Sequence, residues 1–279
     1  MSKNGAALFG VPGIACALLL SACTPEPIAL GKADYSEDGA RCEAGSRTGP
    51  GGVSDQETTP KGVRYNVRTP VNYDATRRHP LLLVLPAAGH NRLRSENFTQ
   101  LTPAATAAGM IVVYSDHIPL SIPVIVEIGK IPGLVAEKWC VDTQRVYLTG
   151  HSDGGIVSNA LAFLDETRGL AAAIAPSGAG LRGSDLKDKT CPEPLPVMVV
   201  HSKDDEEFPG YGAEVAKWWA SCNRCGEAAS EPRGGCRDYP ACAEGVTTRY
   251  CEVSGEHGEW HGLNSALLEF FSAAGRAKG

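Results

Sequence analysis

The fold is indicated most strongly by one stretch, which reads Arg145-Val146-Tyr147-Leu148-Thr149-Gly150-His151-Ser152-Asp153-Gly154-Gly155. Residues 145–149, with Val146, Tyr147 and Leu148 at their centre, predict a buried strand. Residues 155–168 carry apolar side chains at helical spacing. The Gly-x-Ser-x-Gly between them is typical, in this strand–turn–helix context, of a sharp turn that exposes a nucleophilic serine. Ser152 is therefore the candidate nucleophile.

The glycines and the residue after the serine suit this chemistry. Gly150 and Gly154 are small, so the strand and the helix can approach closely. The amide of Asp153 then points at the oxyanion that develops on a substrate, where the helix N-terminus adds positive potential. Two other interpretations are weaker. In the first, Ser152 only caps the helix. In the second, the turn holds a phosphate, but the Gly-x-x-x-x-Gly-Lys-Ser/Thr pattern of such turns is not present.

Strand and helix patterns alternate outward from this turn. Strands are expected at residues 62–68, 80–86, 110–114, 145–149, 171–175, 196–201 and 247–253, and helices at 101–109, 124–138, 155–168, around Trp218 and Trp219, and at 263–274. The alternation predicts an α/β fold with a mostly parallel central sheet and helices on both faces. In such sheets, functional residues collect at the carboxyl ends of the strands.

Composition excludes several classes of protein. The 279 residues are 43% hydrophobic and 21% charged, which excludes a disordered tail, a coiled coil and a collagen-like repeat. The net charge of −6 provides no basic excess to neutralise phosphates, so nucleic acid is not an expected partner. The length favours one α/β domain over two small ones.

The first 22 residues are interpreted as an export signal. Lys3 precedes an apolar run at residues 6–20, which is shorter than the ~20 apolar residues of a transmembrane helix. Leu20-Ser21-Ala22-Cys23 resembles the lipobox of bacterial lipoproteins. The resemblance implies that Cys23 is lipidated and that the chain is anchored to the cell envelope, at the outer membrane if the host has one. The alternative is an ordinary signal and a secreted protein.

The rest of the chain divides into two parts. Residues 23–60 are rich in Gly, Pro, Ser and acidic residues without sustained periodicity, and they are expected to form a tether and an irregular N-terminal segment. Residues 61–279 are expected to form the catalytic domain.

Cysteine usage agrees with export. After Cys16 in the signal and Cys23, eight cysteines remain, and in an oxidising compartment they predict up to four disulfides. They are Cys42, Cys140, Cys191, Cys222, Cys225, Cys236, Cys242 and Cys251. A zinc site at Cys222, Cys225, Cys236 and Cys242 is the competing interpretation. We expect no metal and no cofactor.

A general base and an orienting acid should follow Ser152, in the order Ser, Asp or Glu, His. Asp205 and His257 each follow a predicted strand. The acid would hold the histidine tautomer, and the histidine would take the serine proton. Asp204, Glu206 and Glu207 are rivals for the acid, and His261 is the rival base. The remaining histidines are expected to be ordinary loop or hydrogen-bonding residues, namely His79, His90, His117, His151 and His201.

Several motifs resemble one family of secreted enzymes. His201-Ser-Lys-Asp-Asp205-Glu-Glu-Phe-Pro209 matches its H-G-x-x-D-x-x-x-P, and Cys236-Arg-Asp-Tyr239-Pro-Ala-Cys242 its C-x-x-Y-x-x-C. Cys251-Glu-Val-Ser-Gly255-Glu-His257 fits C-x-x-x-G-x-H, and Cys140-Val141-Asp142 also fits. The sequence thus resembles the polyhydroxybutyrate depolymerase-like proteins and feruloyl esterases of the first carbohydrate esterase family, over about residues 62–271. The resemblance implies an α/β-hydrolase fold and selects Asp205 and His257 as partners of Ser152.

The sequence departs from the family pattern in two places. The family's oxyanion loop usually reads His-Gly, whereas this chain has Pro86-Ala87-Ala88-Gly89-His90. Because proline has no N–H, the second oxyanion donor must be the amide of Ala87 or Ala88, and we assign Ala88. The family's H-x-W-P after the base is His257-Gly-Glu-Trp260-His261 here, with one extra residue.

These features predict an exported serine carboxylesterase that cleaves feruloyl or acetyl esters of polysaccharides. One alternative is a depolymerase of hydroxyalkanoate polyesters, and another is a non-catalytic surface lipoprotein that binds a ligand. The expected partners are an ester substrate and, through the lipid anchor, a membrane. Trp218, Trp219 and Trp260 would line an acyl pocket, although residues spaced like the first two more often pack in the core.

Overall fold

The computed structural model describes residues 27–35, 40–227 and 233–276. The predicted signal peptide (1–22) and the predicted lipidation site at Cys23 lie outside this part of the chain. In the described residues, no helix has both the length and the apolar character needed to cross a membrane.

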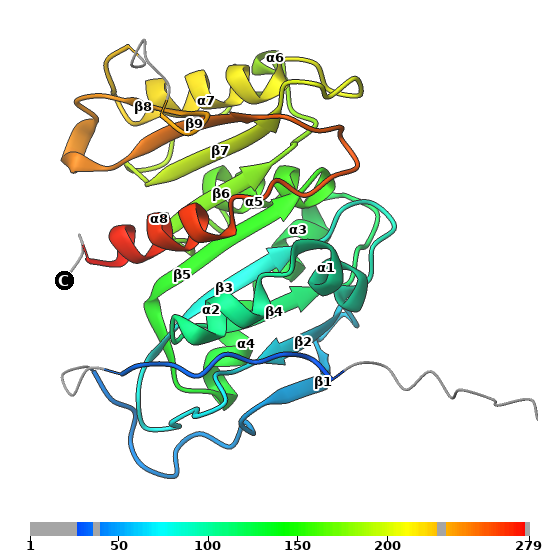
Figure 1. Cartoon of the computed structure of the whole chain (residues 1–279), viewed down its shortest axis with the longest axis vertical. Helices are drawn as coiled ribbons and strands as arrows, with labels where there is room; N and C mark the ends of the chain where they lie inside the picture. The colour runs from blue at the N-terminus through cyan, green and yellow to red at the C-terminus, as the bar shows by residue number, and fades with distance from the viewer. Residues whose placement is uncertain (1–26, 36–39, 228–232, 277–279) are drawn as a thin grey trace, which may run out of the picture.

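A nine-stranded sheet runs through the molecule in the order β1-β2-β4-β3-β5-β6-β7-β9-β8 (Figure 1). Its strands are β1 (Val53–Thr58), β2 (Arg64–Arg68), β3 (His79–Leu85), β4 (Ile111–Ser115), β5 (Val141–His151), β6 (Ala173–Ser177), β7 (Val197–Ser202), β8 (Cys236–Tyr239) and β9 (Thr248–Val253). The central strands from β4 to β9 are parallel, whereas β1 and β2 at one edge and β8 at the other pair antiparallel. Each predicted strand is present.

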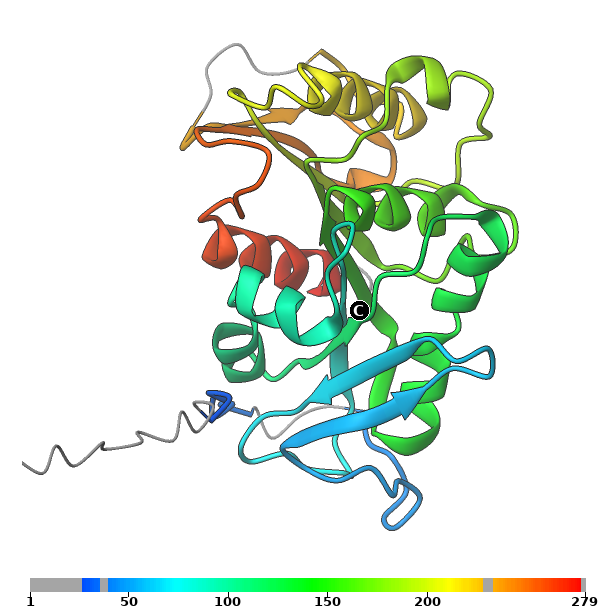
Figure 2. The same ribbon diagram turned by 90° about the vertical axis from the view of Figure 1, so that its right-hand side faces the viewer.

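Helices cover both faces of this sheet, as the edge-on view shows (Figure 2). They are α1 (Arg92–Thr99), α2 (Thr102–Ala107), α3 (Ile122–Ile128), α4 (Ile131–Lys138), α5 (Asp153–Phe163), α6 (Gly183–Leu186), α7 (Tyr211–Cys222) and α8 (Asn264–Arg276), with a 3-10 turn, η1, at Ala243–Gly245. The helices α1, α2 and α8 lie on one face, and α3, α4, α5 and α7 on the other. The predicted fold class is confirmed.

The alternation within β3 shows how the two faces are filled. Leu81 and Leu83 belong to the core beneath α3, α4, α5 and α7, whereas Leu82 and Val84 belong to the core beneath α2 and α8. Because side chains alternate along a strand, a continuous apolar run suits a strand that is buried on both faces.

Part of the predicted irregular segment 23–60 is a strand. β1 pairs antiparallel with β2, with a register shift between Ser54 and Glu57. The strand is polar and half exposed at the sheet edge, so its sequence carries no alternating pattern. A buried ion pair helps to hold it, since the guanidinium of Arg68 contacts Asp55 at 2.7 Å and Glu96 at 2.8 Å.

The predicted helix at 124–138 is two helices. α3 ends at Ile128, and α4 begins at Ile131 with Pro132 in its first turn. A proline lacks the N–H needed to continue a helical hydrogen-bond series, so the chain breaks and restarts there. The predicted helix 155–168 is also shorter, because α5 ends at Phe163. The elements β1, α1, α6, η1 and β8 were not predicted.

The eight cysteines within the described residues are all paired. The disulfides are Cys42–Cys140, Cys191–Cys222, Cys225–Cys242 and Cys236–Cys251. The alternative zinc site is therefore wrong, because its four sulfurs are bonded in three of these disulfides and are not thiolates.

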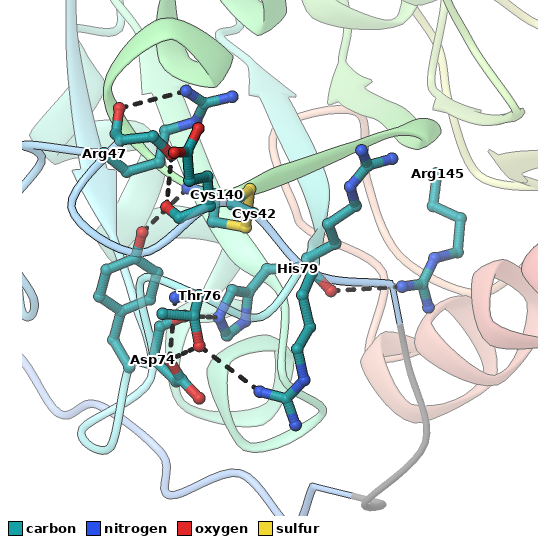
Figure 3. Close-up of a disulfide and its surroundings, with 12 residues drawn as sticks. Cys42, Arg47, Asp74, Thr76, His79, Cys140 and Arg145 are labelled. Carbon is teal, nitrogen blue, oxygen red and sulfur yellow. Dashed lines mark hydrogen bonds between the residues drawn. A yellow bond between two sulfur atoms is a disulfide. The ribbon is translucent and has the colours of Figure 1, made fainter.

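The disulfide Cys42–Cys140 fastens the N-terminal segment to the chain at the start of β5 (Figure 3). Its surroundings include His79, whose ring lies near the carbonyl oxygen of Asp74, and Thr76, which hydrogen-bonds the Asp74 carboxylate. The crosslink spans 98 residues and is thus the longest closed loop of the four.

Replacing Cys42 and Cys140 together with serine is expected to lower the free energy of unfolding by about 3–5 kcal/mol. The reason is that a crosslink over 98 residues removes much loop-closure entropy from the unfolded chain. Urea unfolding of non-reduced protein measures this loss. The matched control replaces Cys225 and Cys242, which span 17 residues, and is expected to lose about 3 kcal/mol. A smaller loss for the long loop than for the short one would contradict the prediction.

Candidate active site

Ser152 lies on the sharp turn between β5 and α5, at the carboxyl edge of the sheet (Figure 1). Its backbone has φ 55° and ψ −116°, a conformation that non-glycine residues rarely adopt. Such strain costs about 1–3 kcal/mol and concentrates at functional sites. The amide of Ser152 donates to the carbonyl oxygen of Ser177 on β6 at 3.0 Å, which helps to hold the turn.

The glycines of the motif allow a close approach of backbones. A Cβ on Gly154 would lie 2.1 Å from the carbonyl oxygen of Leu85 at the end of β3, and one on Gly150 would lie 2.6 Å from the same atom. Neither position has room for a side chain, so the elbow packs against β3 only with glycine there.

The structure brings the predicted triad together. Ser152 Oγ lies 3.0 Å from His257 Nε2, and His257 Nδ1 lies 2.8 Å from Asp205 Oδ2. The hydroxyl is placed to donate to Nε2, while Nδ1–H donates to the carboxylate. The three residues follow β5, β7 and β9, whose carboxyl ends meet at the same edge of the sheet.

The acid is held rigidly beneath the base. Asp205 Oδ1 accepts the backbone amides of Glu207 at 3.0 Å and Phe208 at 2.8 Å, and its side chain is 1% exposed. Burial pushes the pKa of Asp205 upward, but the amide of Phe208 and the imidazole of His257 outweigh it and hold this pKa below its usual value. The carboxylate is thus charged at neutral pH and stabilises an imidazolium.

The rivals of the triad residues lie elsewhere. Asp204 and Glu206 are exposed, and the Glu207 carboxylate, 66% exposed, lies 3.8 Å from His257 Nε2 at the mouth of the site. His261 is buried beside Trp260, with ring centroids 3.9 Å apart. Burial lowers the pKa of His261 to about 3, and the hydroxyl of Ser152 donates to His257 Nε2 instead.

A cleft of about 210 Å³ opens over Ser152 and His257. Ala87 and Ala88, from the loop after β3, line it together with Phe98. Within the described residues, the amides of Ala88 and Asp153 donate to no other group of the chain. Both N–H groups are therefore candidates for the predicted oxyanion donors. Among the described residues, no group of three or more His, Cys, Asp or Glu side chains could hold a metal ion.

Two histidines that the sequence indicated as loop residues are strand residues. His79 is buried at the start of β3, and His151 is buried at the end of β5, where it also lines the cleft. His117 follows β4 and lies beside the elbow, since its Nε2 is 2.9 Å from Asp153 Oδ2. His201 lies near the end of β7, one residue before Ser202, and its Nε2–H donates to the carbonyl of Phe208 at 2.9 Å.

The tryptophans divide between core and site. Trp219 is fully buried and donates to Asn159 Oδ1 at 2.7 Å, and Trp218 packs on Phe163 with ring centroids 5.8 Å apart. Both are packing residues rather than part of an acyl pocket. Trp260 lies at the site, 6.1 Å from Phe98 and 6.3 Å from His151 between ring centroids.

Sequence reasoning missed four lining residues of the cleft, namely His90, Phe98, His151 and Glu207. Phe98 lies on the unpredicted helix α1, which shows little amphipathic pattern. For His151, the signal was its place inside the motif beside Ser152, but nothing in the sequence shows which loop its side chain meets.

Comparison with known proteins agrees with this geometry at the level of the fold. No protein-family model and no curated protein matches the chain. Among solved structures, an acetyl xylan esterase from Aspergillus awamori superposes with a TM-score of 0.58 at 14% identity, covering 80% of this chain and 99% of that one. A thermostable esterase gives 0.56 at 19%, over 77% of this chain and 61% of that one. The S-formylglutathione hydrolase FrmB from Staphylococcus aureus gives 0.56 at 12%, over 80% and 97%. The chain has the α/β-hydrolase fold.

Proposed function

We propose that this protein is a serine hydrolase that cleaves carboxylic esters through an acyl-enzyme on Ser152. The observation that carries the proposal is the hydrogen-bonded series from Ser152 through His257 to Asp205, on a strained turn of an α/β-hydrolase fold. A strained turn and three aligned polar groups are costly for a protein that only binds a ligand. This argues against the non-catalytic alternative.

In the first half of the reaction, Ser152 Oγ attacks the ester carbonyl carbon while His257 Nε2 accepts the hydroxyl proton. The carbonyl oxygen becomes an oxyanion, which the amides of Asp153 and Ala88 stabilise as hydrogen-bond donors. Asp205 stabilises the imidazolium that forms. The intermediate then collapses, the C–O bond to the alcohol breaks, and His257 returns its proton to the leaving alcohol.

In the second half, a water molecule gives its proton to His257 Nε2 and attacks the acyl-enzyme. The same amides meet the second oxyanion, and collapse releases the carboxylic acid and restores the Ser152 hydroxyl with the proton from His257. Each group therefore serves twice, and no co-reactant other than water is needed.

The substrates that fit best are acetyl or feruloyl esters of polysaccharides. The cleft is open and lined by both backbone and the aromatic ring of Phe98, which suits a small or aromatic acyl group on a large soluble alcohol. Structural neighbours that include an acetyl xylan esterase and a carbohydrate esterase from gut microbiota support this choice.

A hydrolysis panel tests the proposal. Purified protein is assayed on p-nitrophenyl acetate, methyl ferulate, acetylated xylan and soluble hydroxybutyrate oligomers. Turnover of the first three above that of the oligomers is expected. Preference for the oligomers would favour the polyester alternative, and no turnover of any ester would favour a non-catalytic binding protein. A phosphonate probe should also label the protein at Ser152, as mass spectrometry of peptides would show.

We also propose that the protein is exported and held on the cell envelope through lipids on Cys23. Four disulfides suit an oxidising compartment. The chain already contacts the folded domain at Gly31, whose amide donates to Thr106 Oγ1 at 2.7 Å, so residues 24–30 are the stretch that would separate Cys23 from that domain.

Replacing Cys23 with alanine is expected to abolish incorporation of radiolabelled palmitate and to move the protein from the membrane fraction to the soluble fraction. The reason is that each buried CH₂ of an acyl chain contributes about 0.8 kcal/mol of membrane binding. Cys16→Ala is the matched control, because it changes a cysteine within the predicted signal peptide and should keep the label. Labelled Cys23→Ala protein would contradict the prediction.

A further inference from the structure

We infer that His151 is a positioning residue that fixes the catalytic base relative to the nucleophile. Its ring forms a bridge between the strand that carries Ser152 and the loop that carries His257. This inference rests on the proposed function, since it concerns the geometry of the same triad.

The bridge consists of two hydrogen bonds. His151 Nε2 lies 2.6 Å from the backbone carbonyl oxygen of His257, and Nδ1 lies 3.1 Å from Ser177 Oγ. A carbonyl oxygen only accepts, so Nε2 carries the proton and donates it. Nδ1 then accepts from the Ser177 hydroxyl.

The imidazole is neutral, as this arrangement requires. Burial lowers the pKa of His151 to about 4, so a single proton resides on the ring at neutral pH. The Ser177 hydroxyl specifies the tautomer by occupying Nδ1. Without it, the proton could move to Nδ1 and the bond to His257 would be lost.

Packing restricts the ring further. It lies 5.4 Å from the Phe98 ring and 5.1 Å from the His257 ring, measured between centroids. A Cβ on Gly178 would come within 2.7 Å of His151 Cε1, so the ring fills the space that this glycine leaves. The imidazole therefore has little freedom to turn.

Hydrogen bonds also hold the loop near His257, since the carbonyl of Gly255 accepts from the Ser202 hydroxyl and its amide donates to Asp204 Oδ2 at 3.2 Å. Residues 254–263 contain no helix or strand, and the hydrogen bond from His257 Nδ1 to Asp205 fixes only the side chain. The bond from His151 fixes the backbone of the same residue and links it to the amino acid next to Ser152. The backbone carbonyl of Ser177 also accepts the amide of Ser152. Ser177 therefore contacts both Ser152 and the His151 ring that holds the backbone of His257.

Substitutions at His151 test the inference. His151→Phe keeps a ring but removes both hydrogen bonds, and it is expected to lower kcat for p-nitrophenyl acetate by about 10–100-fold, because a displacement of ~1 Å costs about 100-fold. KM should change by less than about threefold. His151→Gln retains an N–H that reaches the carbonyl of His257, and it should recover kcat to within about fivefold of wild type.

Buried His79 is the matched control. It lies at the start of β3, at the end of the strands opposite the triad, and its Nδ1 is 2.9 Å from the carbonyl oxygen of Gly109. His79→Phe should reduce stability, measured by urea unfolding, but leave kcat per folded molecule unchanged. Equal kcat values for wild type and His151→Phe would overturn the inference, as would a His151→Gln variant no better than the phenylalanine variant.

A milder variant and a spectroscopic measurement apply if His151→Phe does not fold. Ser177→Ala removes the hydroxyl that keeps the proton of His151 on Nε2. It should shift or broaden the downfield Nδ1–H proton resonance of His257 and reduce kcat about three- to tenfold. An unchanged resonance and unchanged kcat would overturn the inference. The resonance does not depend on turnover, and activity of wild type against Ser152→Ala tests the proposed function separately.

Discussion

Replacing Ser152 with alanine is expected to lower kcat for p-nitrophenyl acetate by about 10⁵–10⁶-fold. The variant lacks the oxygen that attacks the ester, and neither Asp205 nor His257 can form the acyl-enzyme in its place. The residual rate would come from the oxyanion donors and from substrate binding. Folding should be preserved, because alanine adopts the backbone conformation at φ 55° no less easily than serine does.

Ser121→Ala is the control for this experiment. Ser121 is exposed at the start of α3, and its side chain makes no capping hydrogen bond, so the variant should retain wild-type kcat. If Ser152→Ala hydrolysed the ester at the wild-type rate, the esterase proposal would fail and the binding alternative would be favoured.

Replacing Asp205 with asparagine is expected to lower kcat by about 10⁴-fold. The amides of Glu207 and Phe208 both donate to Oδ1, so the asparagine oxygen must occupy that position. The NH₂ group then occupies the Oδ2 position and faces His257 Nδ1, which can no longer donate. The proton is driven to Nε2, and the base cannot accept the serine proton.

The neighbouring carboxylate provides the control for the acid. Asp204→Asn removes one exposed charge next to the same loop and should change kcat by less than about threefold, since exposed charges interact weakly. A pH profile of kcat/KM separates the two variants, because Asp205→Asn should stay low at every pH. A loss of similar size in Asp204→Asn would contradict the assignment of the acid.

Much of the fold was predictable because its signals are local. The apolar run of β3 and the strand–turn–helix of the motif each depend on spacing over about ten residues, and the structure places the corresponding elements as expected. β1 and α1 were missed because their residues are mostly polar and show only a weak amphipathic pattern. β1 is held by its pairing with β2 and by the buried Arg68, which the local sequence does not show.

The disulfide pairing illustrates the same limit. An even number of cysteines in an exported chain predicts disulfides, but eight cysteines allow 105 pairings. Only the folded chain brings Cys42 within a Cα distance of 6.0 Å of Cys140, across 98 residues. The pairing depends on where β5 begins relative to the N-terminal segment.

The amino-acid order alone determined which groups are candidates for the reaction, because Ser152 stands in a Gly-x-Ser-x-Gly motif between a strand and a helix, and because Asp205 and His257 follow strands. Tertiary structure alone decided that these side chains meet within 3.0 Å, that Glu207 stands at the mouth of the site, and that the His151 ring contacts the backbone of His257. The physical reason is that strand order and loop packing bring together residues more than 100 positions apart in the sequence. A local sequence pattern carries no information on such contacts.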